Sequence, residues 1–137
     1  ERASVPPARG GRTAIGRTIT LVLHYPGAVR LAGPVEGLDA VAEPGAALRR
    51  RLLELAGERP DLKLAGLLER FRDDPDERHV VRLAAAEPPL VDDEAAAAAV
   101  LRDSLERIVR DHALTVRKRR AAEALRRARP NADGRAS

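Results

Sequence analysis

Three histidines and two acidic clusters are the side chains in this sequence with the best prospect of metal chemistry. His24, His79 and His112 fall on three separate predicted helices, and none has a second histidine at metal-binding spacing. The acidic runs Asp74-x-Asp76 and Asp92-Asp93-Glu94 resemble magnesium-binding pairs. Each lies where a helix is predicted to begin, so capping of the helix explains it about as completely. We therefore predict no metal site.

Nucleophilic and phosphate-binding chemistry is equally poorly supported. Ser104 lies in the middle of a predicted helix without a partnered base, and no glycine-rich phosphate loop is present. The chain has no cysteine, which excludes a disulfide scaffold, a thiolate zinc site and a cysteine nucleophile. The sequence thus predicts no catalytic residue and no cofactor, and the fragment is not expected to be an enzyme.

A basic segment at residues 117–129 is open to three interpretations. It is the solvated face of a helix in an arginine-rich protein, a nucleic-acid contact that follows phosphates, or a protein contact. No aromatic residue lies in the segment to stack on bases, which weakens the case for single-stranded nucleic acid. In a protein contact, Leu114, Val116, Ala121 and Leu125 would form the apolar centre and the arginines the rim. We favour the protein contact.

The secondary structure that carries these residues is predicted to be helical throughout. The chain has 137 residues, 44% of them apolar but only 1% aromatic, and leucine, alanine and valine dominate. Alanine, leucine and arginine favour helices, whereas strands prefer β-branched and aromatic residues. No apolar run approaches the 18 or more residues that a membrane helix needs, so we expect no membrane partner and a cytoplasmic protein.

The charge of the chain is divided unevenly along its length. Residues 1–17 carry four arginines against one glutamate, and residues 113–137 carry eight basic side chains against two acidic ones. Residues 18–112 carry 13 basic and 18 acidic side chains. An acidic body between basic ends suggests an acidic protein surface or nucleic acid as partner.

Residues 13–92 are predicted to form a helical bundle after a disordered linker end at residues 1–12. The first helix carries Ile15, Ile19 and Val22 on one stripe and stops at Tyr25-Pro26-Gly27. Residues 28–42 predict one or two single-turn helices. The next helix, with Pro44 in its first turn, stops before Pro60 and has Leu48, Leu52 and Leu55 inward and Arg49, Arg50 and Glu54 outward.

Two further helices complete the predicted bundle. Asp61 is expected to cap a helix that contains Leu64, Leu67, Leu68 and Phe71. The run Asp74-Pro75-Asp76-Glu77 is typical of a helix start, with a capping carboxylate, a proline at the first position and a glutamate at the third. It opens a helix with Val80, Val81 and Leu83, which Pro88-Pro89 closes.

The last predicted helix spans residues 93–129 without a proline or glycine. At 1.5 Å per residue it would be about 55 Å long, whereas a globule of the preceding ninety residues is only about 30 Å across. We therefore expect its first half to pack on the bundle through Leu101, Leu105, Ile108 and His112, and its second half to project. Residues 130–137 are predicted to be a disordered tail.

Several segments in order resemble the C-terminal helicase-interaction domain of the bacterial replicative DNA primase. They cover about residues 13–129 and comprise Arg17–Pro26, Val35-Glu36-Gly37-Leu38, Pro44-Gly45 with the leucine-rich helix to Pro60, Leu67–Arg72, Leu83-Ala84 and Leu101–Leu105. The resemblance implies an all-α fold with about five or six bundle helices and a long helix leading into a helical hairpin. It also implies binding to the N-terminal domains of the hexameric replicative helicase, which couples primer synthesis to the replication fork.

The resemblance also implies that this fragment does not catalyse primer synthesis, because the catalytic carboxylates of a primase would lie outside it. The chain also departs from the family. The second hairpin arm usually follows a glycine-containing turn, but here the turn-like residues 130–134 are followed by only three more. Either the chain was cut there or this lineage lacks the arm, which would leave a partial hairpin. An unpaired arm would expose Leu114, Val116 and Leu125, so we expect self-association.

We predict that the partner-binding positions are Leu114, Arg117, Lys118, Arg120, Ala121 and Leu125. The helicase hexamer is the expected partner, and nucleic acid is expected to bind weakly or indirectly. Two alternatives remain open at this point: a basic helical module that contacts nucleic acid, and a dimerisation domain.

Overall fold

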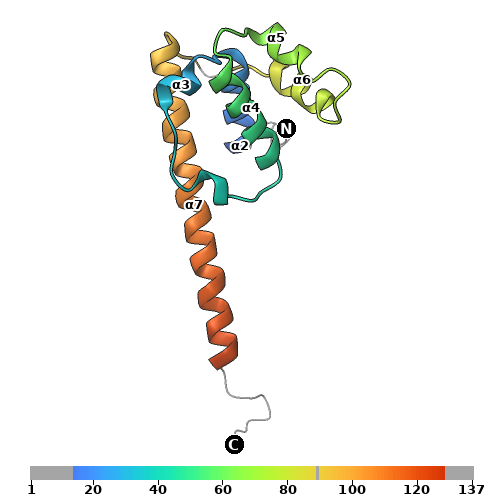
Figure 1. Ribbon diagram of the computed structural model, residues 1–137. Helices are drawn as coiled ribbons and strands as arrows, with labels where there is room; N and C mark the ends of the chain where they lie inside the picture. The colour runs from blue at the N-terminus through green and yellow to red at the C-terminus, as the bar shows by residue number, and fades with distance from the viewer. Residues whose placement is uncertain (1–13, 89, 129–137) are drawn as a thin grey trace, which may run out of the picture.

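The computed structural model describes residues 14–88 and 90–128, which fold into six α-helices and one 3₁₀ helix and contain no strand (Figure 1). The predicted linker end and tail lie outside the described residues. The elements follow the chain in the order α2 (Ala14–His24), α3 (Ala28–Ala32), η1 (Leu38–Ala40), α4 (Ala46–Glu58), α5 (Leu64–Glu69), α6 (Glu77–Ala85) and α7 (Glu94–Ala128). The predicted all-α fold class is confirmed.

Helix α2 is the centre of the core, because it contacts α4, α5, α6 and α7. The predicted stripe of Ile15, Ile19 and Val22 is buried, and so are residues on its other sides. A helix buried on so many sides must satisfy its polar side chains internally. Thr20 does so, since its Oγ1 lies 3.1 Å from the carbonyl oxygens of both Gly16 and Leu83.

The predicted single-turn helices between residues 28 and 42 are α3 and η1. Gly37 precedes η1 with a φ of 87°, a left-handed conformation that strains residues with a Cβ. An added Cβ there would lie 3.1 Å from Cγ1 of Val109 in α7. A glycine at this position therefore lets the chain turn close against α7.

Helix α4 corrects one sequence prediction. Arg50 and Glu54 are exposed as expected, but Arg49 is only 2% exposed, so its outward placement was wrong. The reason is that α4 is covered by α2 on one side and by α3 on another, which buries a wider arc than the leucine stripe. Two nitrogens of the Arg49 guanidinium, Nε and Nη1, have no hydrogen-bond partner, and burial lowers the pKa of this group.

Helix α5 corrects two more. Asp61 does not cap it, because the residue preceding the helix is Lys63 and Asp61 instead pairs with Arg59 at 3.1 Å between Oδ2 and Nη2. That hydrogen bond lowers the pKa of the Asp61 carboxyl. The helix ends at Glu69, so Phe71 lies in the following turn, although its ring is buried as a core residue should be.

The start of α6 differs from the prediction, because the helix begins at Glu77 and the residue before it is Asp76, whose side chain makes no capping hydrogen bond. Asp74 Oδ1 accepts the backbone N–H of Asp76 at 2.8 Å, and Glu77 Oε1 accepts that of Asp73 at 3.2 Å. Arg51 of α4 donates to Asp74 Oδ2 at 2.8 Å and lies 4.6 Å from the centre of the Phe71 ring. The Arg51 hydrogen bond, followed by the backbone one, lowers the pKa of Asp74.

Helix α7 is a single run of 35 residues, about 52 Å long, that lies along one side of the bundle and continues well past it (Figure 1). Ala97, Leu101, Leu105 and Ile108 are buried against the bundle, with α3, α2 and η1 as neighbours. His112 is half-buried, and from Arg117 to Ala128 every residue is exposed. We refer to residues 94–112 as the packed half of α7 and to residues 113–128 as the arm.

Candidate partner-binding surface

The side chains suited to metal chemistry do not meet in this fold. Within residues 14–88 and 90–128, no three histidine or carboxylate side chains are grouped so that they could hold a metal ion. His24 Nε2 donates to the carbonyl of Ala84 at 3.0 Å, which ties α2 to α6. His79 lies on α6 and His112 on α7, each half-buried.

The second acidic cluster behaves as a helix start. Asp93 Oδ1 accepts the backbone N–H of Ala96 at 2.8 Å, the contact expected of a capping carboxylate. Ser104 lies in the packed half of α7 and is half-buried. At this position in the middle of a helix, the backbone N–H and C=O groups of the helix are already hydrogen-bonded to one another. His24 therefore links α2 to α6, and Asp93 caps α7.

The arm has an apolar stripe that faces away from the bundle. Successive residues of an α-helix are rotated by about 100°, so Leu114, Ala121 and Leu125 share one side. By the same geometry the buried residues Leu101 and Leu105 lie on roughly the opposite side of α7. Leu114 is 44% exposed and Leu125 is 73% exposed. We call Leu114, Ala121 and Leu125 the outer stripe, which the bundle does not cover.

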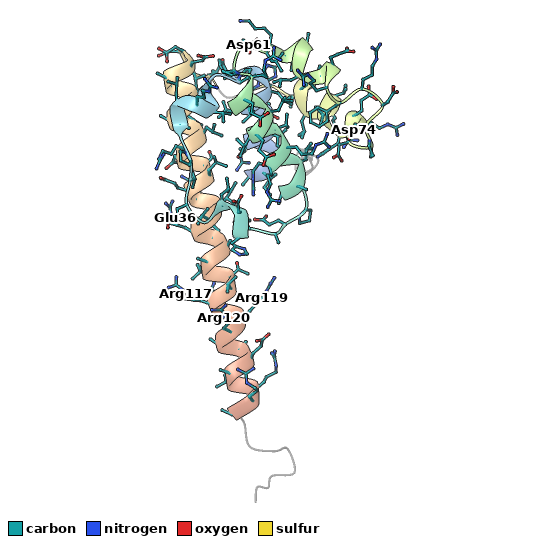
Figure 2. All side chains as sticks on the ribbon, in the orientation of Figure 1. Glu36, Asp61, Asp74, Arg117, Arg119 and Arg120 are labelled. Carbon is teal, nitrogen blue, oxygen red and sulfur yellow. The ribbon has the colours of Figure 1, made fainter. Side chains whose placement is uncertain are left out.

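The basic side chains of the arm are divided between its two sides. Arg117 and Lys118 flank the outer stripe, one on each edge, by the rotation of the helix. Arg119 and Arg126 lie on the side that continues the bundle-facing stripe. Figure 2 shows Arg117 and Arg119 leaving the arm in opposite directions. The outer stripe is therefore an apolar strip with a cation along each edge.

All six predicted contact residues are exposed on the arm, but the structure does not bring them all to one side. Five of them belong to the outer stripe or its edges: Leu114, Arg117, Lys118, Ala121 and Leu125. Arg120 is rotated away by about 120° from the centre of the stripe. Val116 was expected to be exposed with the leucines, but it is half-buried and lies toward the bundle side.

Arg102 is a positioning residue that the sequence analysis did not single out. Its Nη1 donates to the carbonyl of Ala32 at 2.6 Å, and its Nε donates to Glu106 Oε2 at 3.0 Å. It therefore binds the carbonyl end of α3 to the packed half of α7. The i, i+4 spacing of Arg102 and Glu106 was a signal in the sequence, but it predicts only a contact along the helix.

A hollow marks the place where α7 leaves the bundle. It has a volume of about 400 Å³ and lies between the segment before α4 and the end of the packed half. Its lining is largely polar and charged: Glu43, Asp111, His112, Thr115 and Arg119, with Ala42 and Pro44. The hollow separates the bundle from the inner side of the arm, so that Arg119 faces a polar space.

The length and the hydropathy of a helix decide whether it can cross a membrane. No helix in the described part of the chain combines the length and the apolar character needed to cross a membrane.

Comparison with known proteins places this arrangement in a family. Residues 15–133 match the family described as DNA primase DnaG, DnaB-binding. The fold is similar to the crystal structure of the DnaG primase C-terminal domain from Vibrio cholerae, with a TM-score of 0.63 and 25% sequence identity. The similarity covers 88% of this chain and 89% of that one. No curated protein sequence matches the chain.

Proposed function

The chain belongs to the DnaB-binding domain family of DNA primase DnaG, and from that premise we propose that the arm of α7 is its docking element for the helicase. The domain is a non-catalytic part of a primase that binds the DnaB-type replicative helicase. The proposal concerns which of its surfaces makes that contact. We assign it to the outer stripe and its two basic edges.

The single observation that carries this proposal is the exposure of the outer stripe. Leu114 and Leu125 are 44% and 73% exposed, whereas Leu101 and Leu105 in the packed half are 0% and 3% exposed. Exposed apolar side chains aligned on one face of a helix are the pattern by which amphipathic helices enter hydrophobic grooves. The cations at the edges fit the polar rim of such an interface.

The task of the parent protein follows from the same premise. We infer that this domain belongs to a primase that makes RNA primers and that it holds the primase at the helicase. The catalytic carboxylates would lie elsewhere in that protein. Primer synthesis would then be coupled to movement of the replication fork, which places the working protein in the cytoplasm.

Two other partners are secondary in this proposal. Nucleic acid contact is weak or indirect, because the basic side chains of the arm are spread over two sides and no described residue of the arm is aromatic. Self-association through the outer stripe would compete with docking, because it would use the same residues.

The test compares two matched substitutions by binding to the hexameric helicase. Leu125→Asp places a charge on the outer stripe, and Val81→Asp does the same at an exposed apolar residue of α6, 48% exposed. At ~0.3 M salt we expect Leu125→Asp to weaken binding by about tenfold or more, as for a residue at the centre of an interface. Val81→Asp should leave the affinity within about threefold. Equal losses in the two variants would contradict the assignment to the arm.

A further inference from the structure

The outer stripe is narrow, and its edges carry charge of a single sign. Among residues 113–128 the arm has six basic side chains and one acidic one, Glu123. Arg117 and Lys118 stand on the two edges of the outer stripe, while Glu123 lies on the bundle side by the rotation of the helix. No carboxylate of the arm therefore neutralises the edges of the stripe.

A partner that covers the leucines must also meet these two cations. Burying part of a cation without an opposite charge is costly, whereas a carboxylate placed near it both attracts the partner and fixes its register. Ala121 lies between Leu114 and Leu125 and leaves a shallow gap along the stripe, which a bulky aliphatic side chain of the partner can fill.

Resting on the proposed function, we propose that the outer stripe receives a helical protein surface with aliphatic side chains along its centre and carboxylates along both edges. In the terms of the proposed function, this acidic-edged surface is part of the helicase. By the rotation of the helix the stripe faces away from the bundle. Figure 1 shows that the arm extends past α2–α6, so a partner helix can run along the arm without meeting them.

A second copy of this chain fits the stripe poorly. Two arms packed side by side lie 8–10 Å apart, which is about the Debye length at 0.1 M salt. Each would bring six cations and one carboxylate within that distance of the other, so the pair would repel. Charge complementarity therefore favours a partner of opposite sign.

A nucleic-acid duplex also fits the stripe poorly. Phosphate binding needs cations that face the same way, whereas those of the arm are divided between the outer edges and the side of Arg119 and Arg126. The two leucines lie between the edge cations, where a duplex would present phosphates and offer no apolar surface.

The experiment uses two charge reversals that change the net charge equally on opposite sides of the arm. The outer reversal is Arg117→Glu with Lys118→Glu, and the inner reversal is Arg119→Glu with Arg126→Glu. Affinity for the hexameric helicase is measured at ~0.1 M salt, and circular dichroism of both variants checks that the helix remains. We expect the outer reversal to weaken binding by about tenfold or more and the inner one by less than about threefold.

Each other outcome overturns the inference. If the inner reversal weakens helicase binding as much as the outer one, the attraction is general and electrostatic. If both reversals weaken binding to a DNA duplex as much as they weaken binding to the helicase, the arm is assigned to nucleic acid. A wild-type chain that light scattering shows to be a dimer, and that Leu125→Asp turns into a monomer, would assign the stripe to a second copy.

The inference and the proposed function can fail separately. If Leu125→Asp abolishes helicase binding while the outer reversal leaves it unchanged, the arm docks but its partner has no acidic edges. If Leu125→Asp also leaves binding unchanged, the arm is not the docking element and the proposed function fails with the inference.

Discussion

The two halves of α7 both carry leucines at helical spacing but lie in different surroundings. In the packed half, Leu101, Leu105 and Ile108 are at most 4% exposed, whereas Leu114 and Leu125 of the arm are 44% and 73% exposed. The helix continues through both, because extending an existing helix avoids the unfavourable step of nucleation. The comparison teaches that helix continuity is a local property, whereas burial depends on what lies alongside.

The largest expected effect comes from shortening a leucine in each half. Leu101→Ala should lower the free energy of unfolding by about 2–5 kcal/mol, because it leaves a cavity in the core. Leu125→Ala should change it by less than about 0.5 kcal/mol, because the side chain is already solvated. Chemical denaturation of the isolated domain measures both, and similar losses would mean that the arm is covered in solution.

An arginine in each region gives the next contrast. Arg49→Met should raise the free energy of unfolding by about 1–2 kcal/mol, because it removes two buried N–H donors without partners and keeps most of the side-chain volume. Arg120→Met on the arm should be nearly neutral. Thermal denaturation measures both, and destabilisation by Arg49→Met would reveal a partner for that guanidinium.

A smaller effect is expected from pH. The Asp74 carboxyl has its pKa lowered by Arg51, so its contribution to stability is complete at neutral pH and is lost as the pH falls below about 4. The wild type and Asp74→Asn should therefore differ at pH 7 and converge in acid. Glu123→Gln on the arm is the control of equal charge, and a difference between the wild type and Asp74→Asn that persists at low pH would contradict the ion pair.

The smallest effect on the bundle should follow removal of the arm itself. A chain ending at Ala113 loses helix content in proportion to the residues removed, but the bundle should keep its free energy of unfolding within about 0.5 kcal/mol. Circular dichroism and denaturation measure the two quantities. A bundle that unfolds more readily without the arm would mean that the two regions are coupled more strongly than their contacts indicate.

Sequence patterns predicted the elements whose signals are local. The stop at Tyr25-Pro26-Gly27 and the uninterrupted run after Glu94 each depend on residues that break or permit a helix wherever they occur. The capping contact of Asp93 with the backbone N–H of Ala96 is local for the same reason. These predictions did not require knowledge of how the helices pack.

Predictions that depend on neighbouring helices were less successful. Arg49 was placed outward because arginine is seldom buried, but α4 packs against both α2 and α3 and its buried residues include Arg49. Asp61 was predicted to cap α5, but its carboxylate pairs with Arg59 instead. On the arm, Val116 and Arg120 were grouped with Leu114 and Leu125, but the rotation of the helix places both away from the outer stripe.

Because α7 is one continuous helix, the direction in which the outer stripe faces depends on the number of residues in the helix. Each residue added between Ile108 and Leu114 would rotate everything beyond it by about 100° relative to the bundle. Two extra residues would turn the leucines inward beneath the bundle, whereas seven would restore the present orientation and move the face about 10 Å farther out. The arm can therefore change in length only in steps close to whole turns if the outer stripe is to keep facing away from the bundle.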